Sequence, residues 1–201
     1  MKYFRLHNIS RYMVCFLLIS CGASKSDNLL NAPETWRKEV LEFPLLFAKS
    51  LPYTGEEHIR FAEGWGEPEN EEYFSYVFVW ILEEDPNLDA IKITSDMEAY
   101  FTGLMKMGLL SKLRFFKKLP KTKAAFVSSG SGNKRFEGSI DVYDAFFAKE
   151  TIRLHVKVSS SYCTILEKHL VYFRLSPKAF SNVIWTDLEE VTMKPTCSTQ
   201  N

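Results

Sequence analysis

The sequence has little of what most enzyme classes require. Its 201 residues include only four cysteines and four histidines. It has no phosphate loop ending in Gly-Lys-Ser or Gly-Lys-Thr, no His-Glu-x-x-His pair for zinc and no Gly-x-Ser-x-Gly nucleophile turn. Basic and acidic residues number 25 each, so no excess positive charge points to nucleic acid. These absences favour a non-enzymatic protein without a cofactor, and no metal site is expected.

The sequence also lacks an apolar run of the about 20 residues that a membrane-spanning helix requires. The early run at residues 13–19 is short, and Lys2, Arg5 and Arg11 precede it, which is typical of a secretion signal. The residues that end it, Leu18-Ile19-Ser20-Cys21, resemble the lipobox of bacterial lipoproteins.

The lipobox resemblance implies cleavage before Cys21 and attachment of acyl chains to its sulfur. Each methylene buried in a bilayer contributes about 0.8 kcal/mol, so three chains would hold a folded domain on a membrane. The expected organisation is a signal peptide at 1–20, a lipidated flexible tether at 21–32 and a single domain at 33–201. Because Gly22 and not aspartate follows the cysteine, the resemblance further implies the outer membrane as destination, facing periplasm or surface.

The two remaining cysteines of the exported chain are Cys163 and Cys197. An exported protein favours a disulfide between them, and two free thiols are the alternative. The bridge would close a loop of about 33 residues and stabilise the fold by roughly 3 to 4 kcal/mol.

Residues 72–82 (Glu-Tyr-Phe-Ser-Tyr-Val-Phe-Val-Trp-Ile-Leu) predict a central β-strand, because aromatic and β-branched side chains suit a pleated surface. Alternate side chains of a strand point to opposite faces, and here both sets are apolar. The strand therefore predicts cover on both faces.

Flanking patterns predict a single α+β domain, in which a mostly antiparallel sheet of five to seven strands packs against two or three helices. Helices are expected at 34–42, after a capping box at Ser95 and Glu98, and around Trp185. Further strands are expected at 58–62, 88–94, 124–128, 135–143, 151–159 and 169–175.

One loop carries the best candidate for ligand contact. Trp65 lies between two glycines in a polar loop that leads into the central strand, a context that predicts an exposed aromatic ring. Tyr73, at the start of that strand, is the second candidate. The acidic residues around them lack the alternate Asp and Asn spacing of calcium loops, so a solvated turn is the simpler interpretation.

His155 and His169 are the remaining chemical candidates. If residues 151–159 and 169–175 form a hairpin centred near residue 162, His155 would lie opposite His169. A slip of one residue would place them on opposite faces, and exposed polar histidines are the alternative interpretation.

These patterns support three hypotheses about function. The first is a non-enzymatic envelope lipoprotein that acts as a structural or interaction module, held on the membrane by its lipid and contacting an envelope protein. The second is a ligand-binding lipoprotein with an aromatic cleft near Trp65, and the third is a small hydrolase using His155 or His169. The overall organisation resembles the many uncharacterised lipoproteins of Gram-negative envelopes, a likeness that carries no catalytic residues across and leaves the oligomeric state open.

Overall fold

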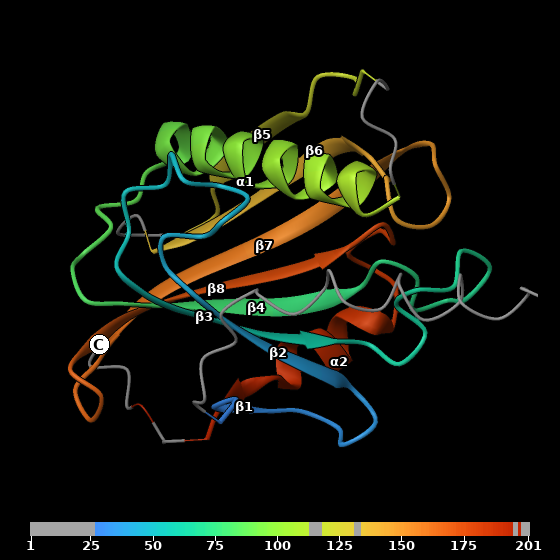
Figure 1. Ribbon diagram of the computed structural model, residues 1–201. Helices are drawn as coiled ribbons and strands as arrows, with labels where there is room; N and C mark the ends of the chain where they lie inside the picture. Colours follow the sequence, from blue (N-terminus) through green and yellow to red (C-terminus); the bar gives the residue numbers. More distant parts are fainter. Residues whose placement is uncertain (1–26, 113–117, 131–133, 195–196, 198–201) are drawn as a thin grey trace, which may run out of the picture.

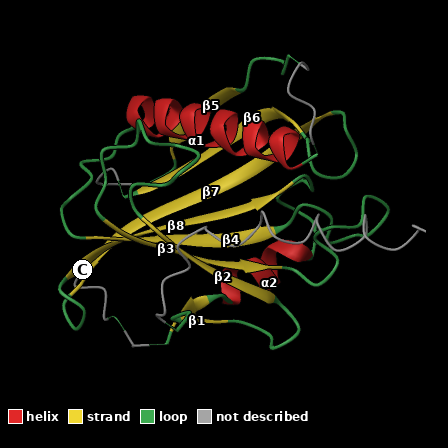
Figure 2. Ribbon diagram, in the orientation of Figure 1, coloured by secondary structure: helices red, strands yellow, loops and turns green. Residues whose placement is uncertain are grey.

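A seven-stranded antiparallel sheet forms the body of the protein (Figures 1 and 2). The computed structural model describes residues 27–112, 118–130, 134–194 and 197. The strand order is β2-β3-β4-β8-β7-β6-β5, with a separate two-stranded ribbon of β1 and β9. The predicted α+β class with a mostly antiparallel sheet is confirmed.

The strands follow the period-2 pattern closely in the second half of the chain. The predicted strands at 124–128, 135–143, 151–159 and 169–175 all exist, and three of them extend further. The bounds are β1 Leu30–Asn31, β2 Arg37–Glu42, β3 Gly55–Phe61, β4 Tyr76–Leu82, β5 Lys123–Ser128, β6 Arg135–Tyr143, β7 Thr151–Cys163, β8 Lys168–Ser176 and β9 Thr192–Met193.

Strand β4 is buried on both faces along its whole length. Phe78 and Trp80 point into a large apolar cluster beneath helix α1, which we call the α1 core. Val77 and Val79 point into a second cluster beneath helix α2, the α2 core. The predicted cover on both faces is confirmed, although residues 72–75 belong to the preceding turn and the strand begins at Tyr76.

Helix α1 (Ala90–Ser111) covers one face of the sheet over β5 and β6 (Figure 1). The predicted start at Ser95 is wrong: the Asp89 carboxylate accepts a hydrogen bond from the Lys92 backbone at 2.7 Å and caps the helix. The strand predicted at 88–94 is therefore the first turn of α1. The predicted apolar stripe is confirmed, since Met97, Phe101 and Met105 are buried. Among the described residues, no helix is both long and apolar enough to cross a membrane.

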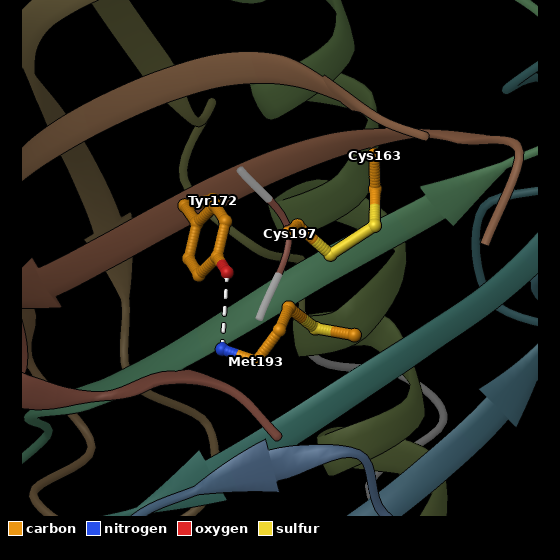
Figure 3. The surroundings of a disulfide bond; sticks show 4 residues. All are labelled: Cys163, Tyr172, Met193 and Cys197. Carbon is orange, nitrogen blue, oxygen red and sulfur yellow. Dashed lines mark hydrogen bonds between the residues drawn. A yellow bond between two sulfur atoms is a disulfide. The ribbon is translucent and has the colours of Figure 1, made fainter. Parts of the chain in front are cut away.

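The other face is covered by helix α2 (Ile184–Glu190) and the β1–β9 ribbon. Cys163, at the end of β7, forms a disulfide with Cys197, and their Cα atoms are 4.9 Å apart. Nearby, the Met193 backbone N–H donates to the Tyr172 hydroxyl at 3.2 Å (Figure 3). Cys197 is thus linked to the α2 core by the disulfide that the cysteine count predicted.

Two predictions near the N-terminus are wrong. The segment predicted as a helix at 34–42 contains strand β2, because Trp36 and Val40 are spaced both for one helical face and for one strand face, and pairing with β3 decides between them. Asn28 and Leu30, inside the predicted tether, are buried, so the folded domain begins before residue 33. The predicted signal peptide and Cys21 lie outside the described residues.

We expect Cys197→Ala to lower the free energy of unfolding by roughly 3 to 4 kcal/mol, because the bridge closes a loop with a sequence separation of 34. Urea unfolding of the oxidised protein measures the change. The reduced wild-type protein is the matched control and should unfold at the same midpoint as the variant. Equal midpoints for the variant and the oxidised wild type would contradict the assignment.

Candidate functional site

A groove of about 470 Å³ opens between helix α1 and the β2–β3 edge of the sheet. It lies within the range of about 300 to 1,000 Å³ that is typical of ligand pockets. Its polar lining residues are Arg37, Glu39 and Ser111. The rest of the lining is apolar or aromatic and consists of Leu41, Phe47, Ile59, Phe61, Trp65, Phe74, Tyr76, Tyr100, Leu104, Met107, Phe146 and Phe147.

The groove exists because α1 lies towards one end of the sheet. The helix packs mainly over β5 and β6, and across its other side the Tyr100 hydroxyl reaches Glu57 on β3. On β2, the alternate residues Arg37, Glu39 and Leu41 all line the groove, as the period of a strand requires. Edge strand, helix and loops therefore make three separate walls.

Trp65 forms part of the loop wall. Its ring, which the sequence predicted to be exposed, is half-buried and packs against Phe61 at 4.4 Å and Phe147 at 4.8 Å between centroids. The loop is held by the Gly64 backbone N–H, which donates to the Glu72 carboxylate at 2.6 Å. A side chain at residue 64 would overlap the side chain of Asn70, so the loop requires glycine there. Glu72, one of the acidic residues of this loop, thus has a structural role.

Tyr73 acts behind the wall and does not line the groove. Its hydroxyl donates to the buried Asp144 carboxylate at 2.6 Å. The same carboxylate accepts hydrogen bonds from the backbone N–H groups of Phe146, Phe147 and Ala148 at 2.5 to 3.1 Å. Burial, followed by the bond to Asp144, raises the pKa of Tyr73. Tyr73 therefore positions the turn that carries Phe146 and Phe147, a role that the sequence did not predict.

Two residues of the groove wall each carry a polar atom with no hydrogen-bond partner in the described part of the chain. Among the described residues, three buried side-chain atoms lack a hydrogen bond, and two of these, Trp65 Nε1 and Tyr76 Oη, belong to groove-lining residues. Tyr76 is only 3% exposed. An unpaired buried polar group costs about 1 to 3 kcal/mol, so each is a specific feature of the wall.

A buried carboxylate lies next to the groove. Glu57 is fully buried on β3 and accepts hydrogen bonds from Trp80 Nε1 and the Tyr100 hydroxyl, each at 2.8 Å. Burial is the largest cause that raises the pKa of Glu57 to about 7, while these two hydrogen bonds lower it. The charge of Glu39 raises the pKa of Glu57 further. Sequence reasoning missed Glu57, although it shares the alternation of Ile59 and Phe61.

The two histidine candidates lie apart. The predicted hairpin centre is wrong, because β7 continues to Cys163 and pairs Tyr162 with His169 and His155 with Ser176. His155 contacts the ring of Phe180 and His169 that of Tyr162. No group of three or more His, Cys, Asp or Glu side chains within the described part of the chain could hold a metal ion.

Comparison of the chain with protein-family models, with curated proteins and with solved structures finds no match. The function must therefore be argued from the groove.

Glu57 should make the stability of the fold depend on pH. Its ordinary pKa is 4.5 and its pKa in the fold is about 7, so between these values only the folded state holds the proton. The free energy of unfolding should fall as pH rises through this window, by roughly 3 kcal/mol. Urea unfolding at pH 5 and pH 8 measures the effect. The free energy of unfolding of Glu57→Gln, relative to that of the wild type, should be higher at pH 8 than at pH 5.

Glu63→Gln is the matched control, because Glu63 is exposed on the neighbouring loop. That variant should track the wild type at both pH values. An equal difference between Glu57→Gln and the wild type at pH 5 and pH 8 would refute the role given to burial.

Proposed function

We propose that this protein is a membrane-anchored envelope lipoprotein whose groove binds a small apolar ligand. The observation that carries the proposal is the groove itself, with about 470 Å³ of space and a mostly aromatic lining, in which two residues carry polar atoms that are unpaired among the described residues. An engineered apolar cavity of about 150 Å³ already holds benzene. The groove of this protein has room for a larger molecule.

Apolar burial would supply most of the affinity, at about 25 cal/mol for each Å² removed from water. Such a ligand gains most when the walls are already in place, because ordering side chains on binding costs affinity. Here Asp144 fixes the turn bearing Phe146 and Phe147, and Glu57 fixes Trp80 and Tyr100. Hydrogen bonds behind the groove thus support its aromatic walls.

The other two hypotheses stay predictions. A structural or interaction module bound to another envelope protein is compatible with the same anchor, but no contact described above favours it. The hydrolase lacks support, since neither His155 nor His169 hydrogen bonds to a serine or carboxylate among the described residues.

We expect a larger side chain on the helix wall to abolish binding. Leu104, which lines the groove from α1, is replaced by tryptophan. The probe is N-phenyl-1-naphthylamine, an uncharged dye that fluoresces in apolar surroundings, titrated into full-length protein carrying Cys21→Ser to prevent lipidation. The wild-type groove should bind the dye, and Leu104→Trp should weaken binding at least tenfold, about 1.4 kcal/mol.

Ile91→Trp is the matched control, because Ile91 is on the same helix but 82% exposed. It adds the same side chain outside the groove and should leave the affinity unchanged. Wild-type affinity in Leu104→Trp would overturn the proposal, and circular dichroism with a thermal melt would show that each variant is folded.

The anchor has its own test. Protein extracted from membranes should have the intact mass of a chain that begins at Cys21 and carries acyl chains, and Cys21→Ser should move the protein out of the membrane fraction. Cys15→Ser, inside the predicted signal, should change neither result. An unmodified Cys21 in the extracted protein would contradict the lipoprotein assignment.

A further inference from the structure

The polar atoms of the groove wall restrict the chemistry of a ligand. This inference rests on the proposed function. Tyr76 begins β4 and Trp65 is on the loop before it, and their ring centroids are 6.4 Å apart. Both residues line the groove, and neither Tyr76 Oη nor Trp65 Nε1 has a hydrogen-bond partner among the described residues. The indole N–H can only donate, so its partner must be an acceptor, and the phenol hydroxyl can donate to the same kind of atom.

Tyr76 Oη has no hydrogen-bond partner among the described residues, although a carboxylate lies nearby. An acceptor is close by: Glu57 is near enough for its charge to affect Tyr76. However, Glu57 Oε1 receives the Tyr100 hydroxyl and Oε2 receives Trp80 Nε1. The Tyr76 hydroxyl bonds to neither oxygen, so this donor is unused among the described residues.

The charges around the groove argue against an ionised polar group in the ligand. Glu39 lines the groove and Glu57 lies behind it, so an anion near Tyr76 would be repelled. Arg37 also lines the groove, but it is exposed, stacks over the Phe61 ring at 5.6 Å and has Glu39 two residues away on the same face. A cation would find carboxylates but would leave the Trp65 N–H unpaired. A neutral acceptor satisfies all these groups.

We propose that the groove selects an uncharged amphiphile: an apolar chain with an ester or amide carbonyl whose oxygen accepts hydrogen bonds from the Tyr76 hydroxyl and the Trp65 indole. The chain lies along the aromatic walls, and the carbonyl reaches the start of β4. A free carboxylate or an amine on the same chain binds more weakly, as does a plain hydrocarbon.

Competition against the naphthylamine dye tests the selectivity. Four probes of matched length are compared at pH 7.5 on full-length protein with Cys21→Ser: methyl octanoate, octanoate, octylamine and nonane. Methyl octanoate should displace the dye at a concentration at least tenfold lower than each of the others. Tighter binding of octanoate or octylamine, or equal binding of nonane and the ester, would overturn this inference while leaving apolar binding intact.

Two variants assign the hydrogen bonds. Tyr76→Phe and Trp65→Phe keep an aromatic ring and remove the donor, so each should reduce the preference for the ester over nonane, Tyr76→Phe by about tenfold. Tyr162→Phe, which removes an exposed hydroxyl elsewhere, should keep the preference. An unchanged preference in both groove variants would refute the assignment. Failure of the wild type to bind the dye or any probe would instead overturn the proposed function.

Discussion

The rest of the structure depends on a strand that has no solvent-facing side. Every side chain of β4 from Tyr76 to Leu82 is buried, so apolar layers must cover both faces of the sheet at its centre. β3 and β8 pair with β4 on either side and leave none of its length as a sheet edge. The result is two cores, one on each face of the sheet. The position of each helix and of the β1–β9 ribbon follows from the core that it covers.

The two layers complete this cover differently. The α2 side is built from short elements, the β1–β9 ribbon, α2 and the disulfide, which together close over Val77 and Val79. The α1 side relies on one long helix, which lies over the β5–β6 end and leaves the β2–β3 end to loops. The groove opens between α1 and the β2–β3 edge, where Tyr100 extends from the helix to Glu57 on β3.

The sequence predicts the long strands better than it predicts the helices and short elements around them. A long alternating run such as β7 indicates a strand clearly, because an apolar period of 2 over many residues excludes a helix. β2 was mistaken for a helix because its few apolar residues fit both periods, and only pairing with β3, distant in sequence, decides. The capping-box pattern at Ser95 places the start of α1 too late, because the carboxylate of Asp89 is the cap that the structure uses. The flanking glycines of Trp65 single it out in the sequence as a candidate for ligand contact. No comparable pattern marks Tyr76 or Glu57. Alternation along a strand predicts that a side chain faces inward, but it does not show whether that side chain meets a packed core or a groove.

Glu57 explains why two of three polar aromatic rings in the α1 core are held by hydrogen bonds while the third, Tyr76, has no hydrogen-bond partner among the described residues. Trp80, Tyr100 and Tyr76 each bring a polar atom to the α1 core, where an unpaired donor is costly. One carboxylate, with one bond to each oxygen, satisfies the first two and fixes their rings in place. The third ring, Tyr76, stands at the first residue of β4 beside Trp65, and its hydroxyl has no hydrogen-bond partner in the described part of the chain. Packing alone does not explain a buried carboxylate, because apolar residues would fill the same space without the free-energy cost of desolvation. The desolvation cost of Glu57 is better explained if ligand binding in the groove depends on the fixed rings and on the remaining donor.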